Sequence, residues 1–378
     1  MQLTERKFDV VTEGELLEDL HTLTNFPVFA GVVDHSYEED LKANMVWSIS
    51  HSSGLIQLKY LLPLDILYQT QTTTNAIGPT WMQHHKEFAK FILNYNPNSV
   101  FEIGGAHGIL SVEYSKYKDI EWTILEPNPS PVNECKAKII KGFFDNEFNI
   151  TDNIDTVIHS HVFEHLYEPV KFLKQLESFI KKGQKMLFSV PNLQSWLTNK
   201  FTNAINFEHT VYLTEPYIDY LLAKYGFKIL EKKFVLDGHS IFYATVRDSN
   251  KTTPEISANL YYENKKTYLD FVDYYEKLVI NLNNNIYACE DNVFLFGAHI
   301  FSQHLIVCGL NTEMIRGILD NDIRKVGKRL YGTHLKVQHP TILKNMKNVK
   351  VILKAGIYNN EIKKDILENI NRETEFLE

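Results

Sequence analysis

The stretch that decides the fold is residues 99–108, Ser-Val-Phe-Glu-Ile-Gly-Gly-Ala-His-Gly. An apolar run reaches an acidic residue and is followed at once by a turn of small residues, with the spacing E-x-G-x-A-x-G. Gly104 and Gly108 give the turn backbone freedom and leave room for a ligand against the main chain. A carboxylate directly before the turn suits a cationic amino-acid cofactor, whereas a diphosphate is typically bound by G-x-G-x-x-G. The stretch therefore predicts a strand, a ligand-binding turn and a helix.

Similar apolar runs follow at 121–125, 156–160 and 185–190, and residues 82–93 and 170–180 have the spacing of helices. Continuously apolar strands that alternate with helices predict a parallel sheet with helices on both faces. Ligands of such sheets bind at the carboxyl ends of the strands. The loops that follow these strands are therefore the place to look for functional residues.

Two further acidic residues follow the glycine turn in the order that a nucleoside cofactor requires. Glu126 ends the second strand and could accept hydrogen bonds from ribose hydroxyls, and Asp145 ends an aromatic–acidic turn, residues 142–145, where an adenine would lie. With the fourth strand, these elements resemble class I S-adenosylmethionine-dependent methyltransferases. The resemblance implies S-adenosylmethionine as cofactor, S-adenosylhomocysteine as product, and a methionine moiety surrounded by Glu102, Gly104, Ala106 and Gly108.

The predicted fold class is α/β, with a central Rossmann-like methyltransferase domain over residues 85–249. A small N-terminal domain would occupy residues 1–84. Residues 250–378 would form a connecting helix and a C-terminal α/β substrate-binding domain, whose strand-like pieces are 293–297, 317–320 and 349–353.

Composition narrows the class of protein. Of the 378 residues, 44% are hydrophobic and 23% charged, which is typical of a globular protein. The formal net charge of −8 offers no basic field to a nucleic acid, so no nucleic-acid partner is expected. No apolar run is long enough for a membrane span, and the cytoplasm is the expected compartment. Three isolated cysteines, Cys135, Cys289 and Cys308, predict neither a disulfide framework nor a zinc knuckle.

The flanks resemble a narrower group, the nucleotide-sugar C-methyltransferases. Residues 26–28, 50–58 and 67–69 are similar to its N-terminal part. Members usually carry a zinc-binding CxxC where this chain has Ser50 and Ser53. A serine hydroxyl is a poor zinc ligand compared with a thiolate, so we expect that the metal has been lost and that the N-terminal domain depends on apolar packing.

The C-terminal region carries the same resemblance, in segments 296–298, 319–321, 325–327, 331–333 and 357–362. In that family this domain helps to hold the nucleotide-sugar. The resemblance thus implies a nucleotide-sugar substrate and a role in cell-surface polysaccharide synthesis.

Methyl transfer to a hydroxyl or a carbon requires removal of a proton, for which histidine is suited because its pKa lies near neutrality. His165 follows the fourth strand at the carboxyl edge of the sheet. His209 follows the fifth strand and its helix, and the adjacent Glu208 could orient its ring or raise its basicity. The family resemblance supports these three as catalytic positions. We expect His239, Asn206 and Asn321 to contact the substrate, although a turn role is about as plausible for His239.

Two tyrosines of that family are missing here. One stands two residues before the glutamate of the Glu–His pair, where this chain has Asn206, and the other lies in the segment 72–76, Thr-Thr-Thr-Asn-Ala. Those phenols belong to enolate chemistry, in which a carbon beside a ketone is methylated. A sugar hydroxyl needs only one base, so the sequence favours O-methylation slightly over C-methylation of a keto sugar.

Two other classes of function stay open at this point. A nicotinamide oxidoreductase is disfavoured because neither glycine turn has G-x-G-x-x-G spacing. A non-catalytic S-adenosylmethionine-binding subunit is disfavoured by the acidic pair Glu102 and Glu126 beside available histidines. No metal site is expected, and the chain could be a monomer or a homodimer.

Overall fold

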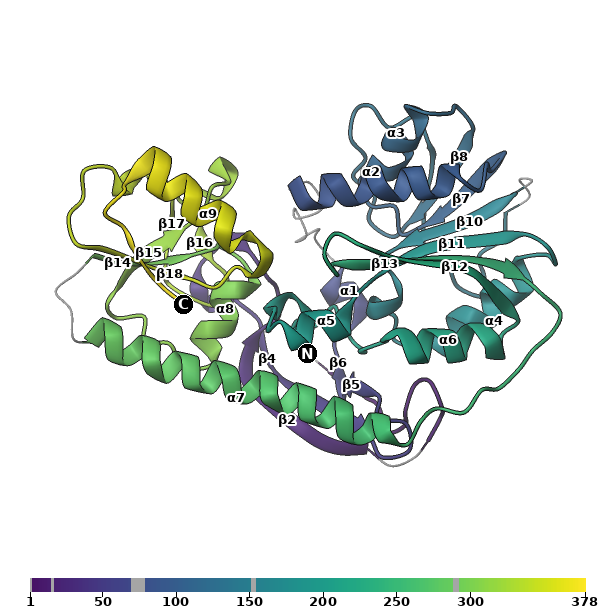
Figure 1. Ribbon diagram of the computed structural model, residues 1–378, viewed down its shortest axis with the longest axis horizontal. Helices are drawn as coiled ribbons and strands as arrows, with labels where there is room; N and C mark the ends of the chain where they lie inside the picture. The colour runs from purple at the N-terminus through teal and green to yellow at the C-terminus, as the bar shows by residue number, and fades with distance from the viewer. Residues whose placement is uncertain (1, 15–16, 69–78, 151–153, 288–291) are drawn as a thin grey trace. The chain divides into compact units, whose positions relative to one another are not determined.

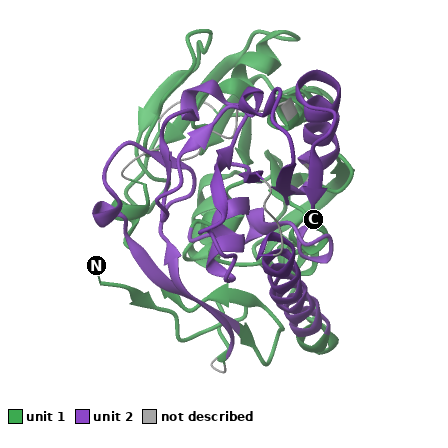
Figure 2. Ribbon diagram, turned by 90° about the vertical axis from the view of Figure 1, so that its left-hand side faces the viewer, with its two compact units in different colours: residues 1–18, 49–195, 208–262 green, residues 19–48, 196–207, 263–378 purple. Residues whose placement is uncertain are grey.

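The computed structural model describes the chain except for residues 1, 15–16, 69–78, 151–153 and 288–291. Cys289 and the segment 72–76 therefore lie outside the described residues. Contacts divide the chain into two compact units, shown in Figure 2. Unit 1 comprises residues 1–18, 49–195 and 208–262, and unit 2 comprises 19–48, 196–207 and 263–378. Each unit thus draws on several segments, and the sequential boundaries after residues 84 and 249 stay predictions.

Unit 1 contains a seven-stranded sheet in the order β12-β13-β11-β10-β7-β8-β9 (Figure 1). Neighbouring strands from β11 to β9 pair in parallel, and β13 runs antiparallel to both β11 and β12. This is the strand order of a class I methyltransferase, so the predicted fold class is confirmed. The strands are β7 (Ser99–Ile103), β8 (Glu121–Glu126), β9 (Lys138–Lys141), β10 (Thr156–Ser160), β11 (Lys185–Pro191), β12 (Phe227–Val235) and β13 (Ser240–Arg247).

Both faces of this sheet are buried, because successive side chains of a strand point to opposite faces. Val100 of β7 packs in one core and Phe101 in the other. The first core is covered by α2 (Pro79–Leu93) and α3 (Ile109–Ser115), and the second by α4 (Pro169–Phe179) and α6 (Glu215–Lys224) (Figure 1). This double burial explains why the central strands read as continuous apolar runs.

The N-terminal part of the chain forms strands of two to eleven residues, the short helix α1 and a 3₁₀ helix at Tyr37–Glu39. Strands β2, β4 and β5 pair in a three-stranded sheet, β1 pairs with β6, and β3 pairs with β16. Their bounds are β1 (Thr4–Glu5), β2 (Leu17–Pro27), β3 (Val32–Val33), β4 (Lys42–Ser50), β5 (Ile56–Leu58), β6 (Tyr60–Leu61), β16 (Arg329–Leu330) and α1 (Leu64–Leu67).

Unit 2 holds a second parallel sheet, in the order β17-β15-β14-β18-β19, as expected for a small C-terminal α/β domain. The predicted connecting helix is α7, whose residues Tyr268, Phe271 and Tyr275 are buried at helical spacing. The elements are α7 (Asn259–Tyr287), β14 (Asn292–Phe296), α8 (Ile300–Val307), β15 (Ile315–Leu319), β17 (Val337–Gln338), β18 (Val349–Leu353), α9 (Asn359–Asp365) and β19 (Glu375–Leu377), and α5 (Leu193–Thr198) follows β11. Among the described residues, no helix has the length and apolarity of a membrane span.

Candidate active site

The turn between β7 and α3 has the conformation that its glycines predict. Gly104 and Gly108 have φ of +77° and +68°, which L side chains rarely adopt. A Cβ atom on Gly108 would lie 2.4 Å from Cys135 Sγ, and one on Gly104 would lie 2.8 Å from a methyl carbon of Val162. The turn is therefore packed closely enough that only glycine fits at either position. Ala106, with φ of +41°, lies between them.

Glu126 reaches this turn from the end of β8. One of its carboxylate oxygens accepts a hydrogen bond from Ala106 N at 3.0 Å, and the other accepts one from Asn128 N at 3.1 Å. The half-buried carboxylate thus lies against the turn, where a ribose bound at the carboxyl edge would meet it. This geometry fits the ribose-binding role that the resemblance implies.

Glu102 lies beneath the same turn and is only 2% exposed. Its Oε2 accepts a hydrogen bond from Trp122 Nε1 at 2.7 Å, and a Cβ atom on Gly105 would lie 3.0 Å from its carboxyl carbon. Burial is the main cause that raises the pKa of Glu102 to about 7, and the nearby Glu126 adds to it. Among the described residues, no ion pair of Glu102 is present, and such a buried acid fits a position that a cofactor's ammonium group would neutralise.

The pKa of Glu102 predicts a pH dependence of cofactor binding. In the protein without cofactor, the neutral form of Glu102 is favoured. The free energy of unfolding that this group contributes is therefore greatest at low pH and is lost as the pH rises through about 7. A cationic ligand favours the carboxylate instead. We therefore expect the Kd of S-adenosylhomocysteine to rise by up to about tenfold per pH unit as the pH falls below 7.

Isothermal titration at several pH values would measure this slope. The matched control is Glu102→Gln, which mimics the protonated acid and should bind with a nearly constant Kd over the same range. Parallel pH profiles of the two proteins would contradict the assignment of Glu102.

Asp145 lies in the turn after β9 and is exposed. Its Oδ1 accepts hydrogen bonds from the backbone amides of Glu147 at 3.0 Å and Phe148 at 3.1 Å, so the side chain stabilises its own turn. A role near the adenine stays a prediction.

The structure brings together the two loops that carry His165 and the pair Glu208–His209. Thr210 N donates a hydrogen bond to Glu164 O at 2.9 Å, and His165 Nδ1 lies 3.0 Å from Glu208 O. The rings of His165 and His209 meet edge to face with centroids 5.0 Å apart. Two segments that are more than forty residues apart in the sequence thus form one cluster at the carboxyl edge of β10.

Glu164 is a member of this cluster that the sequence analysis did not single out. Nitrogen atoms of His165 and His209 and a carboxylate oxygen of Glu164 all lie within 4.8 Å of one another. Glu164 is 1% exposed, and burial is the main cause that raises its pKa to about 7. Its position directly before His165 was the available signal, but sequence alone does not tell which way such a side chain points.

Arg6 holds the two loops together from the N-terminal segment. Its guanidinium donates hydrogen bonds to the carbonyl oxygens of Thr210 at 2.6 Å and Tyr167 at 2.7 Å. The residue is 7% exposed, and burial lowers its pKa to about 10. A planar group with several donors can satisfy carbonyls from both loops at once, which fixes their spacing.

Tyr68 is a second residue that the sequence analysis did not assign to the site. Burial raises the pKa of its phenol well above the usual value, and the negative charges of Glu208, Glu126 and Glu164 add to the shift. The phenol therefore lies within electrostatic reach of Glu126, Glu164 and Glu208.

Ser50 and Ser53, which stand where the sequence resemblance implies cysteines, both make hydrogen bonds through their side chains. The Ser53 hydroxyl donates to Oδ2 of Asp9, and Ser50 Oγ lies 3.0 Å from Ser52 Oγ. Asp9, Ser50 and Ser53 are all at most 1% exposed. The hydroxyls of Ser50 and Ser53 are thus engaged with Ser52 and Asp9, and serine hydroxyls at these positions do not fit a thiolate zinc site.

The three predicted substrate contacts lie in different places. Asn206 belongs to unit 2, where its Nδ2 donates to Asn203 O at 2.9 Å. Asn321 is exposed and follows β15, beside Asp320, whose Oδ2 accepts a hydrogen bond from Ala298 N. His239 lies in unit 1, where it is buried among other histidines. Their contact with substrate stays a prediction.

Comparison with known families agrees with this architecture. Residues 80–232 match a family described as a methyltransferase domain, and residues 237–377 match one described as a C-methyltransferase C-terminal domain. No curated protein sequence matches the chain. The matches confirm the predicted methyltransferase activity and S-adenosylmethionine as cofactor.

Similar solved structures cover about half of the chain. One is a protein from Pyrococcus horikoshii OT3, with 15% identity over 50% of this chain and 100% of that chain and a TM-score of 0.40. Another is magnesium protoporphyrin IX methyltransferase from Synechocystis PCC 6803 with bound S-adenosylhomocysteine. It has 16% identity over 44% of this chain and 83% of that chain, with a TM-score of 0.36. A third is an O-methyltransferase family protein from Burkholderia thailandensis, with 10% identity over 50% of this chain and 62% of that chain and a TM-score of 0.39.

Proposed function

We propose that this S-adenosylmethionine-dependent methyltransferase methylates a hydroxyl group of a nucleotide-linked sugar. The observation that carries the proposal is the cluster of Glu164, His165 and His209 at the carboxyl edge of the sheet that bears the cofactor turn. Such a cluster can accept a proton from an acceptor hydroxyl. The sugar is inferred from the resemblance of both flanks to nucleotide-sugar methyltransferases. The proposal includes a cytoplasmic enzyme that serves cell-surface polysaccharide synthesis.

Each residue of the cluster has a distinct task in this proposal. S-adenosylmethionine supplies a methyl group on a sulfonium, which makes that carbon electrophilic. His209 removes the proton of the acceptor hydroxyl as its oxygen forms the bond to the methyl carbon. The products are a methyl ether, S-adenosylhomocysteine and a protonated His209. A buried carboxylate such as Glu164 stabilises the imidazolium, and Glu208 shapes the loop through its carbonyl contact with His165.

C-methylation of a nucleotide-linked keto sugar is the second candidate. Two observations favour it: the C-terminal match carries the description of a C-methyltransferase, and the half-buried Tyr68 has a phenol within electrostatic reach of Glu208 and Glu164. A phenol at that position could stabilise an enolate in place of the missing tyrosines. The two candidates share the cofactor site and the base, and they differ in the atom that is methylated.

The experiment that tests the proposal uses the purified full chain and S-adenosylmethionine with an isotope-labelled methyl group. A panel of fully hydroxylated and 4-keto nucleotide-sugars is offered, and mass spectrometry and carbon–proton NMR locate the label. A methoxy signal on a hydroxylated sugar is the expected result. A methyl group on a ring carbon would overturn O-transfer in favour of the second candidate. The absence of labelled product with every sugar, despite measured cofactor binding, would overturn the sugar substrate.

A further inference from the structure

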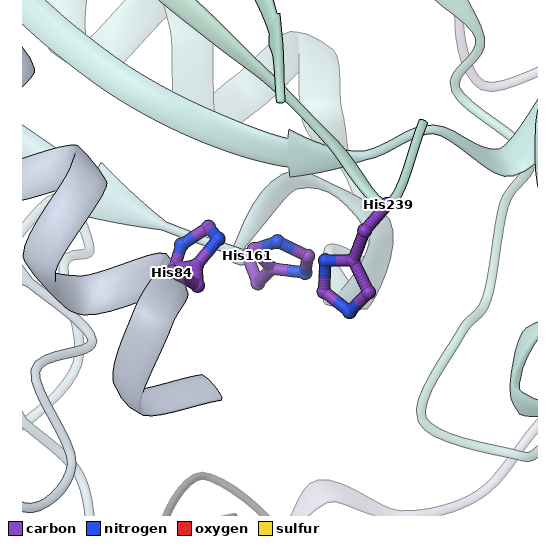
Figure 3. Close-up of side chains that lie close together, drawn as sticks. All are labelled: His84, His161 and His239. Carbon is purple, nitrogen blue, oxygen red and sulfur yellow. The ribbon is translucent and has the colours of Figure 1, made fainter. Parts of the chain in front are cut away.

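Three histidines from distant segments meet in unit 1 (Figure 3). His84 comes from α2, His161 follows β10, and His239 directly precedes β13. One nitrogen atom of each ring lies within 4.8 Å of the other two. His84 is fully buried, His239 is 5% exposed, and the side chain of His161 is 9% exposed. The sequence analysis expects no metal site, because the sequence shows no carboxylate cluster with the spacing of metal ligands.

The three rings converge on one oxygen atom. Ser240 Oγ lies 3.3 Å from His84 Nδ1, 3.0 Å from His161 Nε2 and 2.8 Å from His239 Nδ1. Three imidazole nitrogens around one point are the ligand set of a zinc-type centre with an open fourth position. Each nitrogen would have to move inward by about 1 Å to reach the usual zinc–nitrogen distance of about 2.0–2.1 Å.

The ring nitrogens of His84 and His161 that face away from the Ser240 hydroxyl lie near oxygen atoms of other residues. His84 Nε2 lies 3.1 Å from Ser160 Oγ and 3.3 Å from Ser189 Oγ. His161 Nδ1 lies 3.2 Å from a carboxyl oxygen of the buried Glu164, which is an ion-pair distance without hydrogen-bond geometry. Metal-binding histidines typically donate their second ring N–H to a carboxylate or another oxygen, which fixes the ring orientation.

The surroundings favour a cation in this pocket of imidazoles. Glu164 is buried, and neither of its oxygens makes a hydrogen bond of good geometry among the described residues; its ionised form would place a negative charge beside His161. Trp81 packs edge-on against all three rings, with centroids 4.8 to 5.4 Å away, and limits access of water. Burial also lowers the pKa of each histidine, and the neutral ring is the form that binds a metal.

We propose that His84, His161 and His239 bind one divalent transition-metal ion of the zinc type, which takes the central place that the Ser240 hydroxyl occupies among the three rings. Three protein nitrogen ligands would leave a fourth coordination position for an oxygen ligand. Glu164 also belongs to the cluster with His165 and His209, so it would connect the metal site to His209, the proposed base.

The test is a titration of the chelator-treated full chain with Co²⁺, because tetrahedral Co²⁺ with nitrogen ligands absorbs strongly in the visible range. We expect one ion per chain, displaced by Zn²⁺. His161→Gln and His239→Gln should weaken binding by at least about 100-fold, and Glu164→Gln by about 10- to 100-fold. His334→Gln, which changes an exposed histidine outside the cluster, should bind as the wild type does.

Circular dichroism and S-adenosylhomocysteine binding would establish that each variant is folded. Ser240→Ala provides a further check, since removal of the central hydroxyl should leave Co²⁺ binding intact. No Co²⁺ absorption in the wild type, or an absorption unchanged in His161→Gln and His239→Gln, would overturn the proposal. Loss of binding in Ser240→Ala would overturn the place assigned to the ion. None of these results depends on methyl transfer, so they leave the proposed function to its own experiment.

Discussion

Replacement of His209 by alanine is expected to lower kcat by about 10²- to 10⁴-fold, the usual contribution of a positioned general base. His209 is half-buried and lies beside His165 and Glu164, the group to which the proposed function assigns proton removal. The Kd of S-adenosylhomocysteine should change little, because the residue lies outside the turn between β7 and α3. Steady-state kinetics with the acceptor nucleotide-sugar measure the effect on kcat, and titration with S-adenosylhomocysteine measures the effect on cofactor binding.

The matched control for this variant is His334→Ala, which removes an exposed histidine of unit 2. Its kcat should equal that of the wild type. Added imidazole should restore part of the activity of His209→Ala, since a free base can enter the space left by the ring. Retention of more than about a tenth of the wild-type kcat would assign proton removal to another group.

The second large effect is expected for Glu126→Ala, which should raise the Kd of S-adenosylhomocysteine by about 10- to 100-fold. Hydrogen bonds to a charged group contribute about 1.5–3 kcal/mol, and the ribose would lose its carboxylate acceptor. The substitution also removes the acceptor of Ala106 N and Asn128 N, so the turn itself becomes less well fixed. Isothermal titration measures the affinity, and the thermal midpoint of the empty protein reports any loss of stability.

Glu121→Ala is the control, because Glu121 is exposed at the opposite end of the same strand. Its affinity for S-adenosylhomocysteine should be that of the wild type. Equal affinities for Glu126→Ala and Glu121→Ala would mean that the ribose is bound elsewhere.

The strands buried on both faces could be predicted from the sequence. The predicted bounds of β7 and β10 agree with the structure, and β8 and β11 each extend one residue further. Burial on both faces makes these segments continuously apolar, and this pattern can be recognised without knowing which strands lie beside them. The glycine turn was equally readable, because its φ values allow few other residues.

The sequence pattern of the strands at the β12 edge of the sheet is less typical of a strand. Strand β12, Phe227–Val235, carries three lysines and a glutamate and is exposed along much of its length. Its pairing with β13 is antiparallel and is interrupted by a register shift between Ile229 and Glu231. The sequence analysis therefore predicted neither strand of this pair.

The cluster of His84, His161 and His239 shows why part of a proposed site could not be predicted from the sequence. His84 and His161 stand on a helix and after a strand, and Ser240 begins a third element. Only the order of the strands brings them to one edge, because β13 runs antiparallel and starts where β10 and β11 end. No local spacing could have indicated this meeting.

The most direct test of the account is a crystal structure of the full chain with S-adenosylhomocysteine. The account predicts ribose hydroxyls bonded to Glu126, a methionine moiety along residues 104–108 above Glu102, and a sulfur that faces His165 and His209. A cofactor bound away from Glu126, or a sulfur directed away from both histidines, would contradict it.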